Sequence, residues 1–404
     1  MHRAVRRGLA LAVVVGLAVP ALVIGVGPGA AAAAVPDRRA AACGPIFRDQ
    51  LAATPWPLRR LQPDVAWPLS RGRGVTVAVI DSGVSVDHPK LADRVLAGYD
   101  YLNKGKPAHC DEHGHGTLVA AIIAGRDSPE SPFHGIARDA KILPIRVLPN
   151  AEETTDEQLP KRIADAITWA TDHGADIINL SLTTRDTNDV EQAVRYAVNR
   201  DVVVVAAAGN TGGSAQEGQA VYPAAYRDVI AVAGVDQNDA RVSTSNAGDY
   251  VDVAAPGLAI EGPSTRGRGY VIDAKGGTSF AAAYVSGVAA LIRASYPRLP
   301  ASEVARRIKL TADAPPGGRN DEVGTGVVNP YQAVAAILDD QDRLVPTETE
   351  QLAAPTSAID PLRIVRLVGI GGAVAAAAVV IVLLVLMPGL RAARRRQHEQ
   401  VGRS

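Results

Sequence analysis

The sequence predicts an α/β fold in three layers, with a mainly parallel central sheet between two layers of helices. Five apolar runs have the length of a strand, and we interpret them as buried strands. They are Val75–Ile80, Ile142–Leu148, Ile177–Leu182, Val202–Ala207 and Val229–Val235. Between them, Ile163–His173 and Val190–Asn199 place apolar residues at helical spacing. Continuous apolar strands joined by helical crossovers are typical of a parallel sheet that is covered on both faces.

Composition argues against one class of partner. The chain has 404 residues, with 42 acidic and 42 basic side chains, so its formal net charge is zero. A polyanion such as DNA is attracted by an excess of positive charge, which is missing here. We therefore expect no nucleic-acid partner.

The first residues have the layout of a secretory signal. Arginines precede an uncharged apolar run at Leu9–Val26, and small residues follow at Ala30–Ala34. This order predicts a signal peptide over residues 1–34 with cleavage near Ala34. The alternative is an uncleaved helical anchor, which Pro20 within the run disfavours. Either interpretation predicts export.

A membrane span is expected near the other end. Leu367–Leu390 carries no charge and exceeds the about 20 residues that a helix needs to cross a bilayer. More arginines follow this stretch than closely precede it, which predicts a cytoplasmic tail at 391–404 and places the chain before the span on the extracytoplasmic side. A buried core helix is the alternative. The polar, proline-containing stretch at 339–366 favours a linker followed by a span.

Two segments remain, an N-terminal extension at 35–70 and one large domain at 71–338. The extension is rich in proline and lacks periodicity, so we expect an extended arm that lies on the domain. The only two cysteines are Cys43 and Cys110, and an exported chain permits a disulfide between them. The chain-entropy model assigns such a bond about 4 kcal/mol. Lipid attachment at Cys43 is the competing interpretation.

Three residues have the properties of a nucleophilic triad. Asp81 ends a predicted strand, and the carboxyl ends of parallel strands gather reacting groups. His115 opens a small-residue helical stretch, where a positive charge is disfavoured unless an anion such as Asp81 stabilises the imidazolium. Ser279 follows Gly276, Gly277 and Thr278 and precedes the helical run Phe280–Ala294. We expect Asp81, His115 and Ser279 to act together.

An oxyanion formed at Ser279 needs hydrogen-bond donors. The backbone N–H of Ser279 is the first candidate, because the N-terminal end of a helix favours negative charge. Asn210 lies just past the predicted strand Val202–Ala207, so its side-chain amide is the second candidate. These two groups are the predicted oxyanion hole.

A zinc site is the competing interpretation of the histidine-containing segment. Asp111, His113 and His115 lie close in sequence and are residue types that bind zinc. The triad explains His115 without a metal. We therefore expect neither a metal nor a cofactor.

Four motifs in order carry a resemblance to a known family. IDSG at Ile80–Gly83, HGT at His115–Thr117, AAGN at Ala207–Asn210 and GTS at Gly277–Ser279 resemble those of the subtilisin family. The order Asp, His, Ser also matches. The resemblance implies that an extended peptide binds along two segments, Leu180, Ser181, Leu182 and Ala207, Ala208, Gly209.

The segments on either side of the large domain point to one group within this family. A signal sequence, a proline-rich arm and a C-terminal anchor resemble the mycosins, which are membrane-anchored subtilases of type VII secretion systems. This resemblance implies a serine endopeptidase that cleaves exported protein substrates and associates with a membrane secretion complex. The rival interpretation is a structural component of such a complex, in which catalysis is minor.

Overall fold

The computed structural model describes residues 43–149, 156–214, 216 and 218–338. The predicted signal peptide, linker, membrane span and tail lie outside these residues. Within the described ranges, none of the helices combines the length and apolar character needed to cross a membrane.

A seven-stranded sheet organises the fold, with the strand order β2-β3-β1-β4-β5-β6-β7. Every neighbouring pair in it is parallel. The strands are β1 (Thr76–Asp81), β2 (Tyr99–Asp100), β3 (Lys141–Arg146), β4 (Ile177–Leu180), β5 (Val203–Ala207), β6 (Val229–Val235) and β7 (Val253–Pro256). Because the strands are parallel, their carboxyl ends share one edge, at which Asp81 lies.

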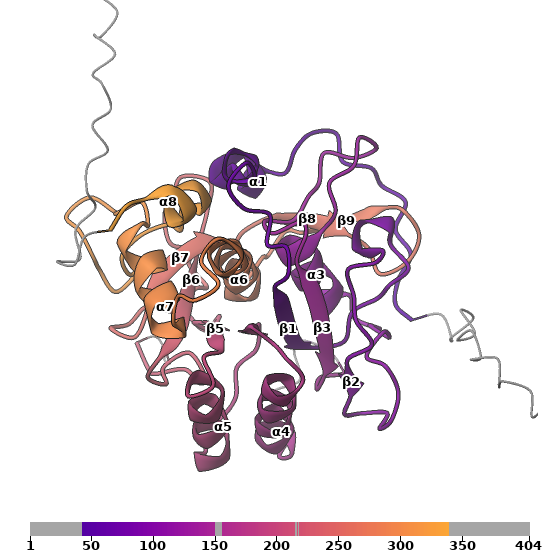
Figure 1. Cartoon of the computed structure of the whole chain (residues 1–404), viewed down its shortest axis with the longest axis horizontal. Coiled ribbons are helices and arrows are strands. Elements are labelled where there is room, and N and C mark those ends of the chain that lie inside the picture. Colours follow the sequence, from indigo (N-terminus) through magenta and orange to yellow (C-terminus); the bar gives the residue numbers. More distant parts are fainter. Residues whose placement is uncertain (1–42, 150–155, 215, 217, 339–404) are drawn as a thin grey trace, which may run out of the picture.

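Helices cover both faces of this sheet (Figure 1). The two faces carry α3 (His115–Ala124) with α6 (Thr278–Ser295), and α4 (Leu159–Asp172) with α5 (Asn188–Val198). Along β1, Val77 and Val79 belong to the apolar cluster that includes α3 and α6, whereas Ala78 and Ile80 belong to the cluster beneath α4 and α5. The alternation of a strand's side chains thus builds two cores, and the three-layer α/β prediction is confirmed.

The remaining elements are short. They are α1 (Trp56–Leu61), α2 (Pro63–Ala66), the 3-10 helix η1 (Pro89–Leu91), α7 (Ala301–Leu310), α8 (Pro330–Ala335) and an antiparallel hairpin of β8 (Ile260–Pro263) and β9 (Tyr270–Asp273). The five strands expected from the sequence correspond to β1, β3, β4, β5 and β6. Strands β2 and β7 were not among them, because β2 has only two residues and β7 ends in a proline, which weakens its strand signal.

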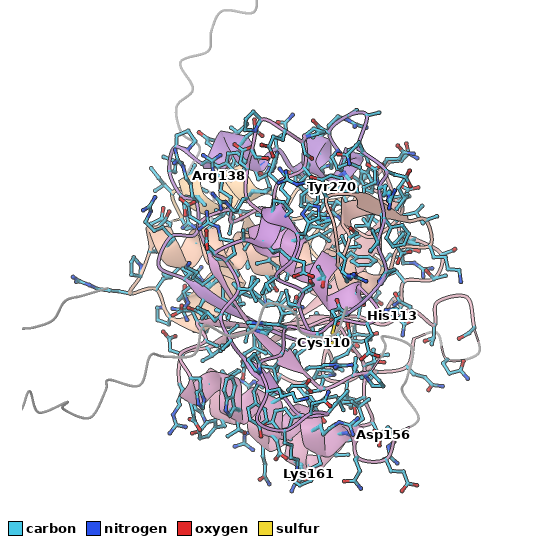
Figure 2. The ribbon with its side chains drawn as sticks, turned by 90° about the vertical axis from the view of Figure 1, so that its right-hand side faces the viewer. Cys110, His113, Arg138, Asp156, Lys161 and Tyr270 are labelled. Atoms are coloured by element: carbon cyan, nitrogen blue, oxygen red, sulfur yellow. A yellow bond between two sulfur atoms is a disulfide. The ribbon has the colours of Figure 1, made fainter. Side chains whose placement is uncertain are left out.

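The N-terminal arm crosses the β8–β9 hairpin before it reaches α1. The Tyr270 backbone N–H donates to the Asp49 carbonyl at 2.8 Å, and the predicted disulfide between Cys43 and Cys110 is present (Figure 2). The expectation of a wholly extended arm is wrong for its second half, where α1 and α2 form. A proline lies in the first turn of each helix, where its missing N–H costs nothing.

Candidate active site

Asp81 is the last residue of β1 and is fully buried. The backbone N–H of Ser82 donates to Asp81 Oδ1 at 2.7 Å. A buried charge requires such partners. The carboxylate therefore has a fixed orientation, with both oxygens facing the start of α3.

His115 is the first residue of α3, and Gly114 before it has a φ of 94° that favours glycine. His115 Nδ1 lies 2.8 Å from Asp81 Oδ1 and 3.0 Å from Oδ2. Since a carboxylate only accepts hydrogen bonds, Nδ1 carries the hydrogen. This leaves Nε2 as the proton acceptor, on the other side of the ring.

The charges around His115 favour the protonated form of its ring. Burial is the largest single effect and opposes a positive charge on the ring, but the carboxylates of Asp81, Asp111 and Asp273 together outweigh it, so the pKa of His115 is raised above its ordinary value. The side chain is 10% exposed. An imidazolium formed here would be stabilised where bulk water does not screen it.

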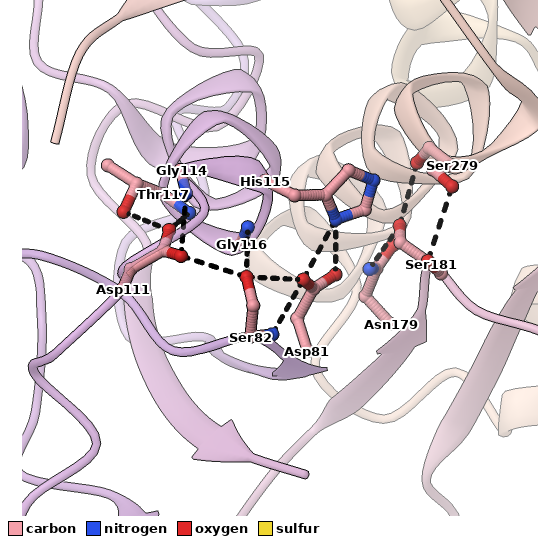
Figure 3. Close-up of polar contacts among 10 residues, drawn as sticks. All are labelled: Asp81, Ser82, Asp111, Gly114, His115, Gly116, Thr117, Asn179, Ser181 and Ser279. Atoms are coloured by element: carbon pink, nitrogen blue, oxygen red, sulfur yellow. Dashed lines mark hydrogen bonds and ion pairs between the residues drawn. The ribbon is translucent and has the colours of Figure 1, made fainter. Parts of the chain in front are cut away.

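Ser279 is the second residue of α6 and is 9% exposed. Its hydroxyl donates to the Ser181 carbonyl at 3.2 Å, and Ser181 Oγ donates to the Ser279 carbonyl at 2.7 Å. In Figure 3 the His115 ring lies between Asp81 and Ser279. Within the described part of the chain, His115 and Ser279 share no direct hydrogen bond, so proton transfer requires the Ser279 hydroxyl to turn from Ser181 toward Nε2.

Asn210 lies beside the start of α6. Its Oδ1 accepts hydrogen bonds from the backbone N–H of Thr278 at 2.9 Å and from the Thr278 hydroxyl at 3.0 Å. Both contacts occupy the oxygen, so the NH₂ group is the end of the amide that is left to donate. A Cβ at Gly277 would lie 3.2 Å from Asn210 Nδ2, so the amide nitrogen is close to the backbone that leads into α6.

The two predicted substrate-binding segments end neighbouring strands. Leu180 ends β4 and Ala207 ends β5, and these strands pair in parallel. Ser181 and Leu182 continue the first segment, while Ala208 and Gly209 continue the second. The Ala208 backbone is already engaged, because its N–H donates to Val232 and its carbonyl accepts from the Tyr250 hydroxyl.

The residues considered for zinc do not converge. The Asp111 carboxylate accepts hydrogen bonds from Ser82, Gly114 and Thr117 instead, and the His113 and His115 rings are 6.5 Å apart. Among the residues that the structure describes, no group of three or more His, Cys, Asp or Glu side chains is placed to hold a metal ion.

Sequence reasoning missed two neighbours of the triad. Phe280 lies against the His115 ring, with ring centroids 5.3 Å apart. Its place directly after Ser279 was the available signal. Asp111 was considered only as a metal ligand, and nothing in its sequence position indicated contacts with both Ser82 and Thr117.

Comparisons with known proteins agree with this geometry. The model of the subtilase family, peptidase family S8, matches residues 72–326. Thermitase of Thermoactinomyces vulgaris is 39% identical over 68% of this chain and 94% of its own length. Mycosin-1 of Mycobacterium tuberculosis is 34% identical over 80% of this chain and 83% of its own length.

Solved structures give the same result. MycP1 from Mycobacterium smegmatis is 30% identical with a TM-score of 0.66, and the match covers 76% of this chain and 91% of that one. A chain from the periplasmic assembly of the ESX-5 inner membrane complex is 32% identical with a TM-score of 0.64, over 79% and 92% of the two chains. The chain belongs to the subtilase family of serine endopeptidases and is related to the mycosins of ESX, or type VII, secretion systems.

Proposed function

We propose that this protein is a membrane-anchored serine endopeptidase that cleaves exported protein substrates within a type VII secretion system. The observation that carries the catalytic part is the hydrogen bond from His115 Nδ1 to Asp81, which leaves Nε2 facing the side of Ser279. The family of the chain supports the same chemistry.

In the proposed mechanism, Ser279 Oγ attacks the carbonyl carbon of a peptide bond while His115 Nε2 takes the hydroxyl proton. Asp81 stabilises the imidazolium and remains ionised. The negative oxygen of the tetrahedral intermediate accepts hydrogen bonds from the Asn210 amide and the Ser279 N–H. His115 then donates its proton to the leaving amine, and an acyl-enzyme forms. Water, deprotonated by His115, releases the second product.

The location of the protein follows from segments outside the described residues. Residues 1–34 act as the signal peptide, 339–366 as the linker and 367–390 as the single span, so the peptidase domain at 71–338 faces the extracytoplasmic side. The disulfide agrees with an oxidising compartment. A protease held there meets exported proteins as they leave the membrane.

The test compares cells that produce the full chain with cells that produce Ser279→Ala. New N-termini on exported proteins are identified by mass spectrometry, and carbonate extraction of membranes tests the anchor. We expect a set of N-termini that depends on Ser279, and a chain that stays in the membrane pellet. Identical N-termini in both cells would refute the proteolytic role, and release by carbonate would refute the span.

The second candidate function is a structural component of the secretion complex. It is favoured by the similarity to a chain of the ESX-5 periplasmic assembly. Secretion measured in cells that lack the protein, rescued by wild type or by Ser279→Ala, separates the two functions. Full rescue by Ser279→Ala would establish a structural role that needs no cleavage.

A further inference from the structure

A second buried carboxylate, Asp111, lies beside the Asp81–His115 pair (Figure 3). Its exposed fraction is 0%. Oδ1 accepts from the Ser82 hydroxyl at 2.9 Å and from the Gly114 N–H at 2.8 Å. Oδ2 accepts from the Thr117 N–H at 2.8 Å and from the Thr117 hydroxyl at 2.6 Å.

The hydrogen bonds at Asp111 favour its ionised form. A carboxylate accepts about four hydrogen bonds, and two backbone N–H groups and two hydroxyls around Asp111 supply that number. Burial raises the pKa of Asp111, while the hydrogen bonds from Thr117 and Gly114 oppose the rise. The group is thus a negative charge held in place by the start of α3.

Ser82 connects this carboxylate to the triad. Its hydroxyl oxygen lies 2.9 Å from Asp111 Oδ1 and 3.1 Å from Asp81 Oδ1, and it accepts from the Gly116 N–H at 3.1 Å. The hydroxyl is placed to donate to either carboxylate, with the shorter contact to Asp111, and Ser82 thus joins the end of β1 to the first turn of α3. The Ser82 backbone N–H is the group that orients Asp81.

Close backbone contacts make this connection rigid. A Cβ at Gly116 would lie 2.2 Å from the Gly83 carbonyl oxygen, and a Cβ at Gly83 would lie 2.1 Å from the Cys110 carbonyl oxygen. Only glycine fits at both positions. The end of β1, the Cys110–Asp111 segment and α3 are therefore packed against one another.

We propose that Asp111 is a positioning residue for the catalytic pair, because its carboxylate fixes Ser82 and the first turn of α3 and so holds His115 against Asp81. This inference rests on the proposed function. Asp111 touches no substrate. It acts through Ser82, Gly114 and Thr117, and its charge acts on His115 from the side away from Ser279.

The negative charge of Asp111 should affect the pH dependence of activity. A purely structural role of this residue would not. Asp81, Asp111 and Asp273 are the carboxylates that raise the pKa of His115, against the effect of burial, and His113 is the other titratable ring nearby. Neutralising Asp111 removes one of these anions. The pKa of His115 then falls, and the acidic limb of kcat/KM moves to lower pH.

The test uses Asp111→Asn in the full chain with a fluorogenic peptide substrate. The matched control is Asp176→Asn, because Asp176 accepts the Thr76 N–H at the opposite end of β1. We expect a kcat loss of about 10- to 100-fold at nearly constant KM, as for a misplaced catalytic group, with the limb moved to lower pH. In the control variant, the acidic limb of kcat/KM should stay at the wild-type pH. An unmoved limb in Asp111→Asn, or a kcat loss no larger than the control's, would overturn the proposal.

Two further measurements keep the proposal testable. If Asp111→Asn does not fold, Ser82→Ala removes the connection and leaves the Gly114 and Thr117 contacts in place, and a wild-type kcat in that variant would overturn the proposal. If wild type cleaves no peptide, the proposed function fails by itself. The midpoint of the His115 NMR titration then decides the role of Asp111, and an equal midpoint in wild type and Asp111→Asn would contradict it.

Discussion

Thr278 holds the Asn210 side chain by its oxygen, through the backbone N–H at 2.9 Å and the hydroxyl at 3.0 Å. The residue directly before the proposed nucleophile therefore orients the proposed oxyanion donor. Because Thr278 and Ser279 are consecutive residues at the start of α6, the bonds from Thr278 tie the Asn210 side chain to the segment that carries the Ser279 N–H. Preorganised donors of this kind need no rearrangement when negative charge develops.

Asn210→Ala tests this relation. Removing the amide takes one donor from the oxyanion, and we expect kcat to fall by about 10²- to 10³-fold, the loss known for such a donor in subtilisin, a relative of this chain. KM should change little. Thr278→Ser keeps the hydroxyl and the N–H and should retain most of the activity. Wild-type kcat in Asn210→Ala would remove Asn210 from the mechanism.

Asp81→Asn should fold and lose activity. An amide NH₂ facing Nδ1 favours the tautomer that carries its hydrogen on Nε2, and a protonated Nε2 cannot take the Ser279 proton. The expected loss in kcat is about 10⁴-fold. Steady-state kinetics and near-UV circular dichroism of the same sample check both statements, and a loss below 10-fold would show that the carboxylate is dispensable.

The pH dependence should reveal the raised pKa of His115. The base must be neutral to accept a proton, so kcat/KM falls as pH drops through this pKa. Because the carboxylates of Asp81, Asp111 and Asp273 together raise the pKa, the acidic limb should lie above the ordinary histidine value of about 6.5. A limb below that value would mean that burial outweighs these carboxylates.

The disulfide should stabilise the fold through the arm. Replacing Cys43 and Cys110 together by serine removes the cross-link, and the chain-entropy model predicts a free energy of unfolding lower by about 4 kcal/mol. Thermal unfolding of the full chain under oxidising conditions measures the difference. An unchanged midpoint would mean that the hydrogen bonds between arm and hairpin suffice.

Several elements were predictable because their signal is local. β6 and α5 follow from a buried apolar run and from apolar residues at helical spacing, and both occur where these patterns predict them. Strand β7 and the β8–β9 hairpin were missed, since β7 and β8 end in proline and only the first residue of β9 is buried. What stabilises them is pairing with distant parts of the chain, such as β6 and the arm.

The site also has a part that the sequence predicts and a part that it does not. Asp81, His115 and Ser279 stand in motifs whose residue types suggest a chemistry, and their order along the chain is informative. The contacts of Asp111 with Ser82, and of Ser181 with Ser279, arise only when strands and helices far apart in sequence pack together. No spacing in the sequence encodes these contacts.

The central claim is an activated nucleophile at Ser279. Its most direct test is reaction of the full chain, in membranes, with a fluorophosphonate probe, comparing wild type, Ser279→Ala and His115→Ala. We predict rapid labelling of wild type, none of Ser279→Ala, and labelling of His115→Ala that is slower by orders of magnitude. Equal labelling of wild type and Ser279→Ala, or no labelling of folded wild type, would contradict it.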